Sequence, residues 1–204
     1  AAARTSAAMF HGHGGRAEAV EVDTERFFRV VDRAIIEQVS KQSQLPIVLA
    51  ALPEYQGVFR KISHNTQLLK DGISIDPTSL SVEELRQRAW QIVEPVLQER
   101  VTTEIARFKK AHGTGLASDN IQSILAAILD GRVQTLFISA DQRIAGRILR
   151  EQKQIEFLDD FSAPDTEDVL DDLAEMTIRR SGKLWVLPKN AMPTDTGIAA
   201  IYRY

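Results

Sequence analysis

The sequence has 204 residues, enough for one large or two small domains, and its 44% hydrophobic and 26% charged residues are typical of a globular protein. A net charge of -3 gives no global case for nucleic-acid binding, so any contact with RNA needs a local basic patch. The absence of cysteine excludes disulfides and thiolate chemistry and fits a cytoplasmic location, and no apolar run reaches the ~20 residues of a membrane span.

A glycine-rich segment, His11-Gly12-His13-Gly14-Gly15-Arg16, lies near the start of the sequence. Its glycines disfavour a helix interior, where each costs about 1 kcal/mol relative to alanine. We therefore predict that residues 1–22 form a mobile arm that carries this segment. The glycines let the backbone approach another molecule closely, while the histidines and the arginine supply donors and positive charge. A merely flexible approach to the first helix is the alternative interpretation.

The spacing of apolar residues predicts a first helix from Asp23 or Thr24 to about Gln42, with Phe27 and Phe28 in the core. The apolar run Leu45–Leu52 predicts a strand that is buried on both faces. A short helix over 54–61 and an edge strand near 72–75 are expected to follow.

Ser81 and Glu84 form a capping box, which opens a long helix that ends at His112. We expect Pro95 to kink this helix. The glycines at 113–115 end the helix and mark the predicted domain boundary.

Beyond the boundary, helices alternate with short apolar strands, which indicates an α/β domain. A basic segment at 143–153 precedes residues 156–175, whose charges are all acidic. The predicted elements are a helix over 121–129 capped by Ser118 or Asp119, a strand over 132–138, a helix from Thr166 to about Arg180, and strands over 183–187 and 198–204.

Several segments together resemble one protein family. His11-Gly-His-Gly-Gly15, followed by Arg26-Phe-x-Arg29 on a helix, is similar to the loop and following helix of archaeal and eukaryotic class-one peptide-release factors. The strand at 45–52, the long helix and Gly131-Arg-Val-x-Thr-Leu-Phe-Ile138 come in the family's order, and the tail at 192–204 resembles the bacterial branch of that superfamily.

The resemblance implies an α/β fold in two parts. Residues 23–112 would form a portion of an RNase H-like middle domain, and residues 116–204 a compact α/β/α third domain. The family's N-terminal domain and the first strands of the middle domain have no counterpart in this sequence, so we expect it to be a fragment of a longer chain.

The resemblance also implies a function in translation termination or ribosome rescue, with the ribosome and tRNA as partners and no cofactor. In this family the loop enters the peptidyl-transferase centre, where water attacks the ester of peptidyl-tRNA. Gly14 and Gly15 would let main-chain N–H groups donate to the oxygen that gains charge, and one such donor is worth about 3 kcal/mol. Arg16 stands where the family has glutamine, and a guanidinium cannot accept a hydrogen bond from water. The sequence therefore leaves hydrolysis and a non-catalytic ribosome- or RNA-binding role both open.

The residues expected to contact RNA share a positive or donor-rich side chain near the glycine-rich segment: His11, His13, Arg16, Arg26 and Arg29. The two loop histidines lack a third ligand at a suitable spacing, so no metal site is predicted.

The acidic block at 156–175 is typical of a solvated or partner-binding surface. The partner-binding residues we expect in it are Asp159, Asp160, Asp168, Asp171 and Asp172. The resemblance implies a translational GTPase as the partner of the third domain, and an interaction scaffold is the remaining alternative function.

Overall fold

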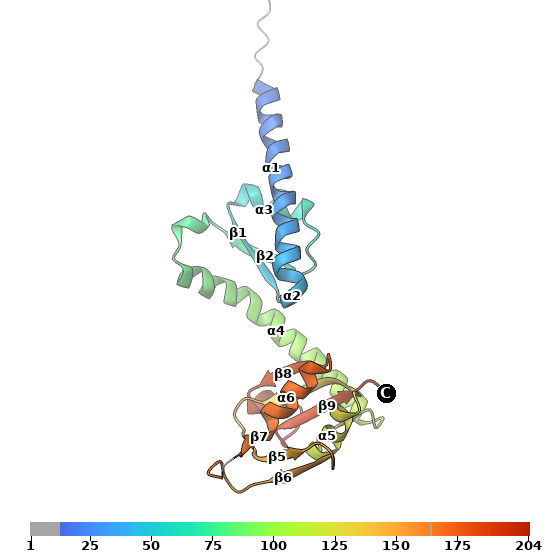
Figure 1. The fold of residues 1–204 in the computed structure, drawn as a ribbon. Coiled ribbons are helices and arrows are strands. Elements are labelled where there is room, and N and C mark those ends of the chain that lie inside the picture. Colours follow the sequence, from blue (N-terminus) through green and yellow to red (C-terminus); the bar gives the residue numbers. More distant parts are fainter. Residues whose placement is uncertain (1–12, 164) are drawn as a thin grey trace, which may run out of the picture. The chain divides into compact units, whose positions relative to one another are not determined.

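The computed structural model describes residues 13–163 and 165–204, with side chains from Val22 onward. The fold is mixed α/β, as predicted (Figure 1). The chain divides into two compact units, one that ends at Gln98 and one that spans Glu99–Tyr204. The division falls inside helix α4 (Val82–His112), whereas the sequence places a boundary after this helix, at 113–115.

The first unit begins with a long helical stretch and continues with a parallel β-α-β arrangement (Figure 1). Strands β1 and β2 pair in parallel, with Ile47 opposite Leu68 and Ala51 opposite Ser74. Its elements before α4 are α1 (His13–Ile35), the π-helical turn η1 (Ile36–Ser40), α2 (Lys41–Ser43), β1 (Ile47–Ala51), α3 (Pro53–Ile62), β2 (Leu68–Ser74) and the 3-10 turn η2 (Pro77–Ser79).

The strand and short helix predicted at 45–52 and 54–61 are confirmed as β1 and α3. The prediction that β1 is buried on both faces is wrong, because its residues are half-buried and the sheet has only two strands among the described residues. The buried Gln56 amide of α3 donates to the carbonyl oxygens of Leu49 (3.2 Å), Ala51 (3.4 Å) and Ile73 (3.1 Å). These bonds join α3 to both strands.

Phe27 lies outside the core, contrary to the prediction, because its side chain is 62% exposed while Phe28 is half-buried. The buried face of α1 passes instead through Asp32, which is 4% exposed. The Asp32 carboxylate accepts hydrogen bonds from Ser63 Oγ (2.5 Å) and from the backbone N–H of His64 (2.9 Å). These hydrogen bonds offset the cost of burying a carboxylate. A polar residue can therefore stand on the buried face of α1, which the spacing of apolar residues does not predict.

The second unit contains a four-stranded sheet with the order β3-β9-β4-β8 and a three-stranded sheet with the order β6-β5-β7. In the larger sheet β4 is parallel to β8 and antiparallel to β9. The elements after α4 are β3 (Ala117–Ser118), α5 (Ile121–Leu129), β4 (Val133–Ser139), β5 (Ala145–Leu149), β6 (Gln154–Phe157), β7 (Glu167–Asp168), α6 (Val169–Arg179), β8 (Lys183–Leu187), the 3-10 turn η3 (Lys189–Ala191) and β9 (Ile198–Tyr202).

Two hydrophobic clusters cover the two faces of the larger sheet. One joins α5 and α6 to β4 and β9 through residues such as Leu125, Leu173 and Leu136. The other packs Phe108 of α4 against Phe137 of β4, with ring centroids 6.2 Å apart. The second half of α4 therefore forms a layer of this unit, which explains why the division lies at Gln98 rather than after the helix.

Three helix starts test the predicted caps. The capping box is confirmed, since Ser81 N–H donates to Glu84 Oε2 (2.8 Å) and Glu84 N–H to Ser81 Oγ (3.3 Å). The caps predicted at Ser118 or Asp119 and at Thr166 are wrong: Asn120 caps α5 by accepting from Ser123 N–H, and Asp168 caps α6. Both caps lie immediately before the first helical residue, where a side-chain oxygen reaches the free N–H groups.

Candidate functional site

The glycine-rich segment is the first candidate site, and its first two residues, including His11, lie outside the described part of the chain. Helix α1 begins at His13, so Gly14, Gly15 and Arg16 belong to its first turn. The predicted arm over residues 1–22 is therefore wrong from residue 13 onward. The residues after Arg16 are rich in alanine and glutamate, which favour helix and extend it back to the glycines. In a first turn, main-chain N–H groups have no partner within the helix.

Arg26 and Arg29, the predicted RNA-contacting arginines, lie exposed on α1. The Arg26 guanidinium is 3.9 Å from the Asp23 carboxylate, and Arg29 Nη2 donates to Glu25 Oε2 at 3.1 Å. Exposed pairs within one helix contribute only a few tenths of a kcal/mol each. Both guanidinium groups can therefore leave these partners for a phosphate at little cost.

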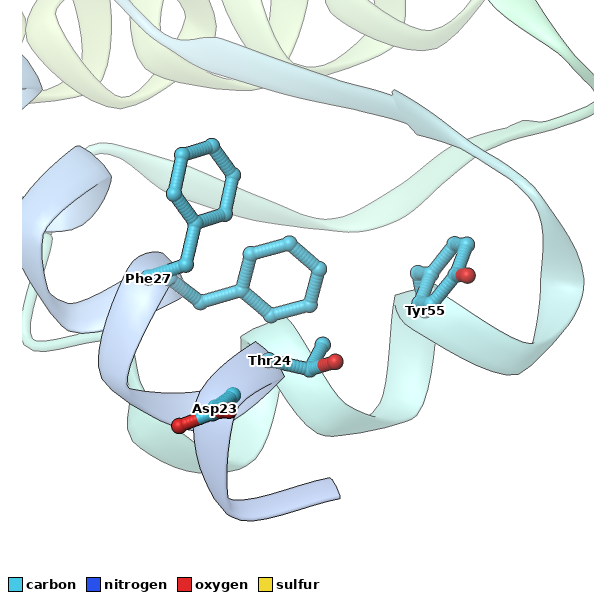
Figure 2. Close-up of a pocket in the computed structure, with 5 residues that line it drawn as sticks. Asp23, Thr24, Phe27 and Tyr55 are labelled. Carbon is cyan, nitrogen blue, oxygen red and sulfur yellow. The ribbon is translucent and has the colours of Figure 1, made fainter. Parts of the chain in front are cut away.

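A pocket of about 470 Å³ lies beside these arginines, between α1 and α3. Figure 2 shows Asp23, Thr24 and Phe27 on α1 and Tyr55 on α3 around it. The Phe28 ring also lines the pocket and meets the rings of Tyr55 and Phe59 edge to face, at centroid distances of 5.9 and 5.5 Å. Sequence reasoning assigned both phenylalanines to the core and missed this pocket, because Tyr55 joins it only through the fold.

A second pocket, of about 280 Å³, continues along α1. It is bordered by the cationic residues Arg29, Arg33 and Lys41 and by His64, together with the acidic residues Asp32 and Glu37. Because Asp32 is engaged by Ser63 and His64, its charge is compensated within the fold. The cations of this pocket come from three segments, since Arg29 and Arg33 lie on α1, Lys41 on α2 and His64 after α3.

A known protein family matches the part of the chain that contains the glycine-rich segment and the pockets along α1. The model of bacterial archaeo-eukaryotic release factor family 3 matches residues 2–132, which is more than half of the sequence. The chain belongs to this family. The match covers the glycine-rich segment, α1 and the first unit, and ends one residue before β4.

Solved structures with a similar fold include two proteins whose names refer to translation. The chain is 15% identical to Dom34 of S. cerevisiae, a translation termination-like factor, with a TM-score of 0.55 over 89% of this chain and 52% of that one. It is 18% identical to archaeal Pelota in a ribosome-bound model with ABCE1, with a TM-score of 0.52 over 88% of this chain and 49% of that one. The family 3 chain thus spans about half the length of both, and at these identities the likeness concerns the fold. No curated protein sequence matches it.

The predicted partner-binding aspartates of the family 3 chain occupy different environments. Asp159 and Asp171 are exposed, and exposed Asp160 accepts a hydrogen bond from Ser162 N–H at 2.8 Å. Asp168 is engaged within the fold, because its carboxylate caps α6 and also accepts from Ile144 N–H and Arg143 Nε, both at 3.1 Å.

Asp172, the fifth predicted aspartate, is half-buried on α6. Burial and, to a lesser extent, the neighbouring Glu167 carboxyl raise the pKa of its carboxyl to about 6. Its Oδ2 atom is buried and has no hydrogen-bond partner among the described residues. The first turn of α6 therefore holds a carboxyl group that titrates near neutral pH.

The basic segment at 143–153 is used largely within the second unit. Arg143 pairs with Asp168, and Lys153 Nζ lies 2.7 Å from Asp130 Oδ1. Arg147 Nε donates to the Asp165 carbonyl oxygen at 3.1 Å. This segment belongs to the β5–β6 hairpin. The hairpin was not predicted, because the segment was interpreted by its charges. The alternation of polar and apolar residues in Gln154-Ile-Glu-Phe157 is the signal that indicates a strand.

The described residues contain neither of two further classes of site. No group of three or more His, Asp or Glu side chains there is placed to hold a metal ion. No helix in the same part of the chain is long and apolar enough to cross a bilayer.

Proposed function

We propose that this chain acts on the ribosome as a release-factor-like protein and frees the nascent chain from peptidyl-tRNA, in termination or in rescue. The observation that carries the proposal is the family match, which includes the glycine-rich segment and α1. The fold shared with ribosome-bound archaeal Pelota supports the ribosome as the destination.

The chemistry we propose uses the first turn of α1. There the backbone N–H groups of Gly14 and Gly15 are free of helical partners and aim along the helix axis, where partial positive charge favours an anion. When water attacks the peptidyl ester, these N–H groups would donate hydrogen bonds to the ester oxygen. The bonds would stabilise the negative charge that develops on this oxygen in the transition state. The absence of a Cβ at both positions lets the helix end approach an RNA-walled site.

The same proposal gives α1 a role in docking. His11, His13 and Arg16 would contact tRNA or ribosomal RNA at the tip of the helix, and Arg26 and Arg29 would contact phosphates further along it. The exposure of both arginines and the weakness of their ion pairs support this role. The aromatic pocket lined by Phe27 and Tyr55 offers ring faces beside these cations, on which an unpaired base can stack.

We further propose that the first unit corresponds to a portion of an RNase H-like middle domain and the second to the family's third domain. The acidic start of α6, with exposed Asp171 beside Asp172, would bind a partner protein such as a translational GTPase. Dom34, which shares the fold, interacts with Hbs1, and this supports the assignment of a protein partner.

Peptide release from purified ribosome complexes tests the proposal. The wild-type protein should release peptide. The methyl group of Gly15→Ala should hold the N–H away from the ester and reduce the rate by about 100- to 1,000-fold, the usual effect of losing one oxyanion donor. Gly57→Ala is the matched control, since an added Cβ there meets nothing within 4 Å on the exposed face of α3. Equal release by all three proteins would refute the assignment of catalysis to the glycines.

Arg16 favours a second candidate function, a non-catalytic ribosome- or RNA-binding factor. A guanidinium donates hydrogen bonds and pairs with phosphate, but it cannot accept a proton or a hydrogen bond from water. In this case the protein sediments with ribosomes without releasing peptide, and raised salt abolishes the association. The variant Arg16→Gln separates the two functions: it should increase release if positioning of water limits the rate, and weaken ribosome binding if Arg16 acts only in docking.

A further inference from the structure

Six cationic side chains meet at one end of the four-stranded sheet in the second unit. The parallel strands β4 and β8 begin at this end, antiparallel β9 finishes there, and α6 terminates beside it. We call this surface the basic end, and it consists of Arg107 and Lys110 on α4, Arg132 before β4, Arg180 after α6, Lys183 on β8 and Arg203 after β9.

Hydrogen bonds link five of these residues in two groups. Arg203 N–H donates to the Arg132 carbonyl oxygen at 2.8 Å, and Arg203 Nη2 donates to the Arg180 carbonyl oxygen at 3.1 Å. Arg107 and Lys183 share the buried carboxylate of Glu104, at 2.8 and 3.0 Å. All six side chains except the half-buried Arg132 are exposed. They lie at the same end of the sheet, with Arg107 and Lys110 on the face that α4 covers and Arg180 on the face that α6 covers.

The acidic groups near the basic end do not neutralise it. Glu104 is 7% exposed and is shared between two cations, so it leaves one positive charge of that trio uncompensated. Asp130 is 3.8 Å from Arg132 but only 2.7 Å from Lys153. On α6, Asp171 and Asp172 lie in the first turn, at the opposite end of the helix, and Glu175 pairs with Arg179.

The basic end also contains a pocket of about 490 Å³. Arg107 and Lys110 border it, and its apolar wall includes Leu116, Ile201 and Tyr202. The Arg132 guanidinium lies over the Tyr202 ring, 5.3 Å from its centroid. The pocket thus combines cations on one side with apolar and aromatic surface on the other.

We propose that the basic end is an RNA-binding site, at which several cations contact the phosphate backbone and the pocket receives an unpaired base. Cations carried by several different elements match a polyanion whose charges repeat along a chain. The planar guanidinium groups suit phosphate, and an apolar wall beside an aromatic ring suits the face of a base. The surface lies in a different unit from α1, and RNA binding there does not require the proposed release activity.

Fluorescence anisotropy with a labelled short single-stranded RNA of mixed sequence tests this site in the intact chain. The double variant Lys110→Glu/Arg180→Glu should bind at least about tenfold more weakly at 0.1 M salt, and the slope of log K against log salt should fall by about 1.4, because each lost phosphate contact removes about 0.7. The control Lys70→Glu/Lys189→Glu changes the net charge equally at exposed positions, one on β2 of the first unit and one after the far end of β8, and should bind as wild type does.

Three results would overturn the proposal: no RNA binding by the wild-type chain at low salt, equal weakening by the two double variants, or an unchanged salt slope in the first. Binding of a labelled polyglutamate peptide that depends on Lys110 and Arg180, without RNA binding, would also overturn it and identify an acidic protein as the partner. Circular dichroism checks that each variant is folded. Lys110→Gln/Arg180→Gln, which removes the charges without reversing them, should also weaken binding and lower the slope.

Discussion

Replacing Gln56 with methionine should destabilise the first unit by about 2–4 kcal/mol. The Gln56 amide nitrogen carries two hydrogens and lies within reach of three carbonyl oxygens on β1 and β2. Methionine has a similar length but cannot donate, so two carbonyl groups lose a partner. A buried polar group left without its bond costs about 1–3 kcal/mol, so two cost about 2–6 kcal/mol. We expect the lower part of this range, because Leu49 and Ala51 are only half-buried.

Urea denaturation measures this change separately in the two units, because each contains one tryptophan, Trp90 in the first and Trp185 in the second. In a Trp185→Phe background, fluorescence reports on the first unit alone. With an m-value of about 2 kcal/mol/M, the Gln56→Met substitution should lower the midpoint by about 1–2 M. Gln91→Met, at an exposed position of α4, is the matched control and should leave the midpoint unchanged. A midpoint that moves no further for Gln56→Met than for this control would refute the reasoning.

Three other predictions follow from the same geometry. Phe28→Ala should destabilise the first unit by about 3 kcal/mol, whereas exposed Phe27→Ala should be nearly neutral; equal urea midpoints would contradict this. Glu104→Gln should cost the second unit about 1–3 kcal/mol in Trp185-monitored unfolding, since two charge-assisted bonds weaken. Because the folded-state pKa of Asp172 is raised to about 6, its stabilising contribution is complete below about pH 4 and is lost as the pH rises through 6; Asp172→Asn should remove this loss in urea midpoints measured at pH 4.5 and 7.5.

The elements that were predicted correctly are those whose formation depends on residues close together in the sequence. The apolar runs at 132–138 and 183–187 became β4 and β8. Strand β4 lies inside the sheet and buries nearly every side chain, whereas β8 is an edge strand and is only partly buried. The Ser81–Glu84 capping box formed as expected, since its bonds involve only residues three apart. Such features depend on a few neighbouring residues, which the sequence displays directly.

Features that depend on distant partners escaped prediction. The buried face of α1 includes Asp32, which is tolerated only because Ser63 and His64 donate to it from another part of the chain. The aromatic pocket needs Tyr55 of α3 opposite Phe28 of α1. At the candidate site, the glycines of the first turn misled the prediction because an isolated propensity argument does not weigh the helix-forming residues that follow.

Side-chain charges of opposite sign stand at the two ends of α6. Asp171 and Asp172 stand in the first turn of this helix and Arg179 and Arg180 at its end, so the side-chain charges oppose the dipole of the helix backbone and stabilise it. Near a polyanion, the negative end is repelled while the basic end is attracted, and the torque turns the unit before contact is made. Because the Debye length is only about 8 Å at 0.15 M salt, this rotation acts in the last few ångströms of approach and fades as salt increases.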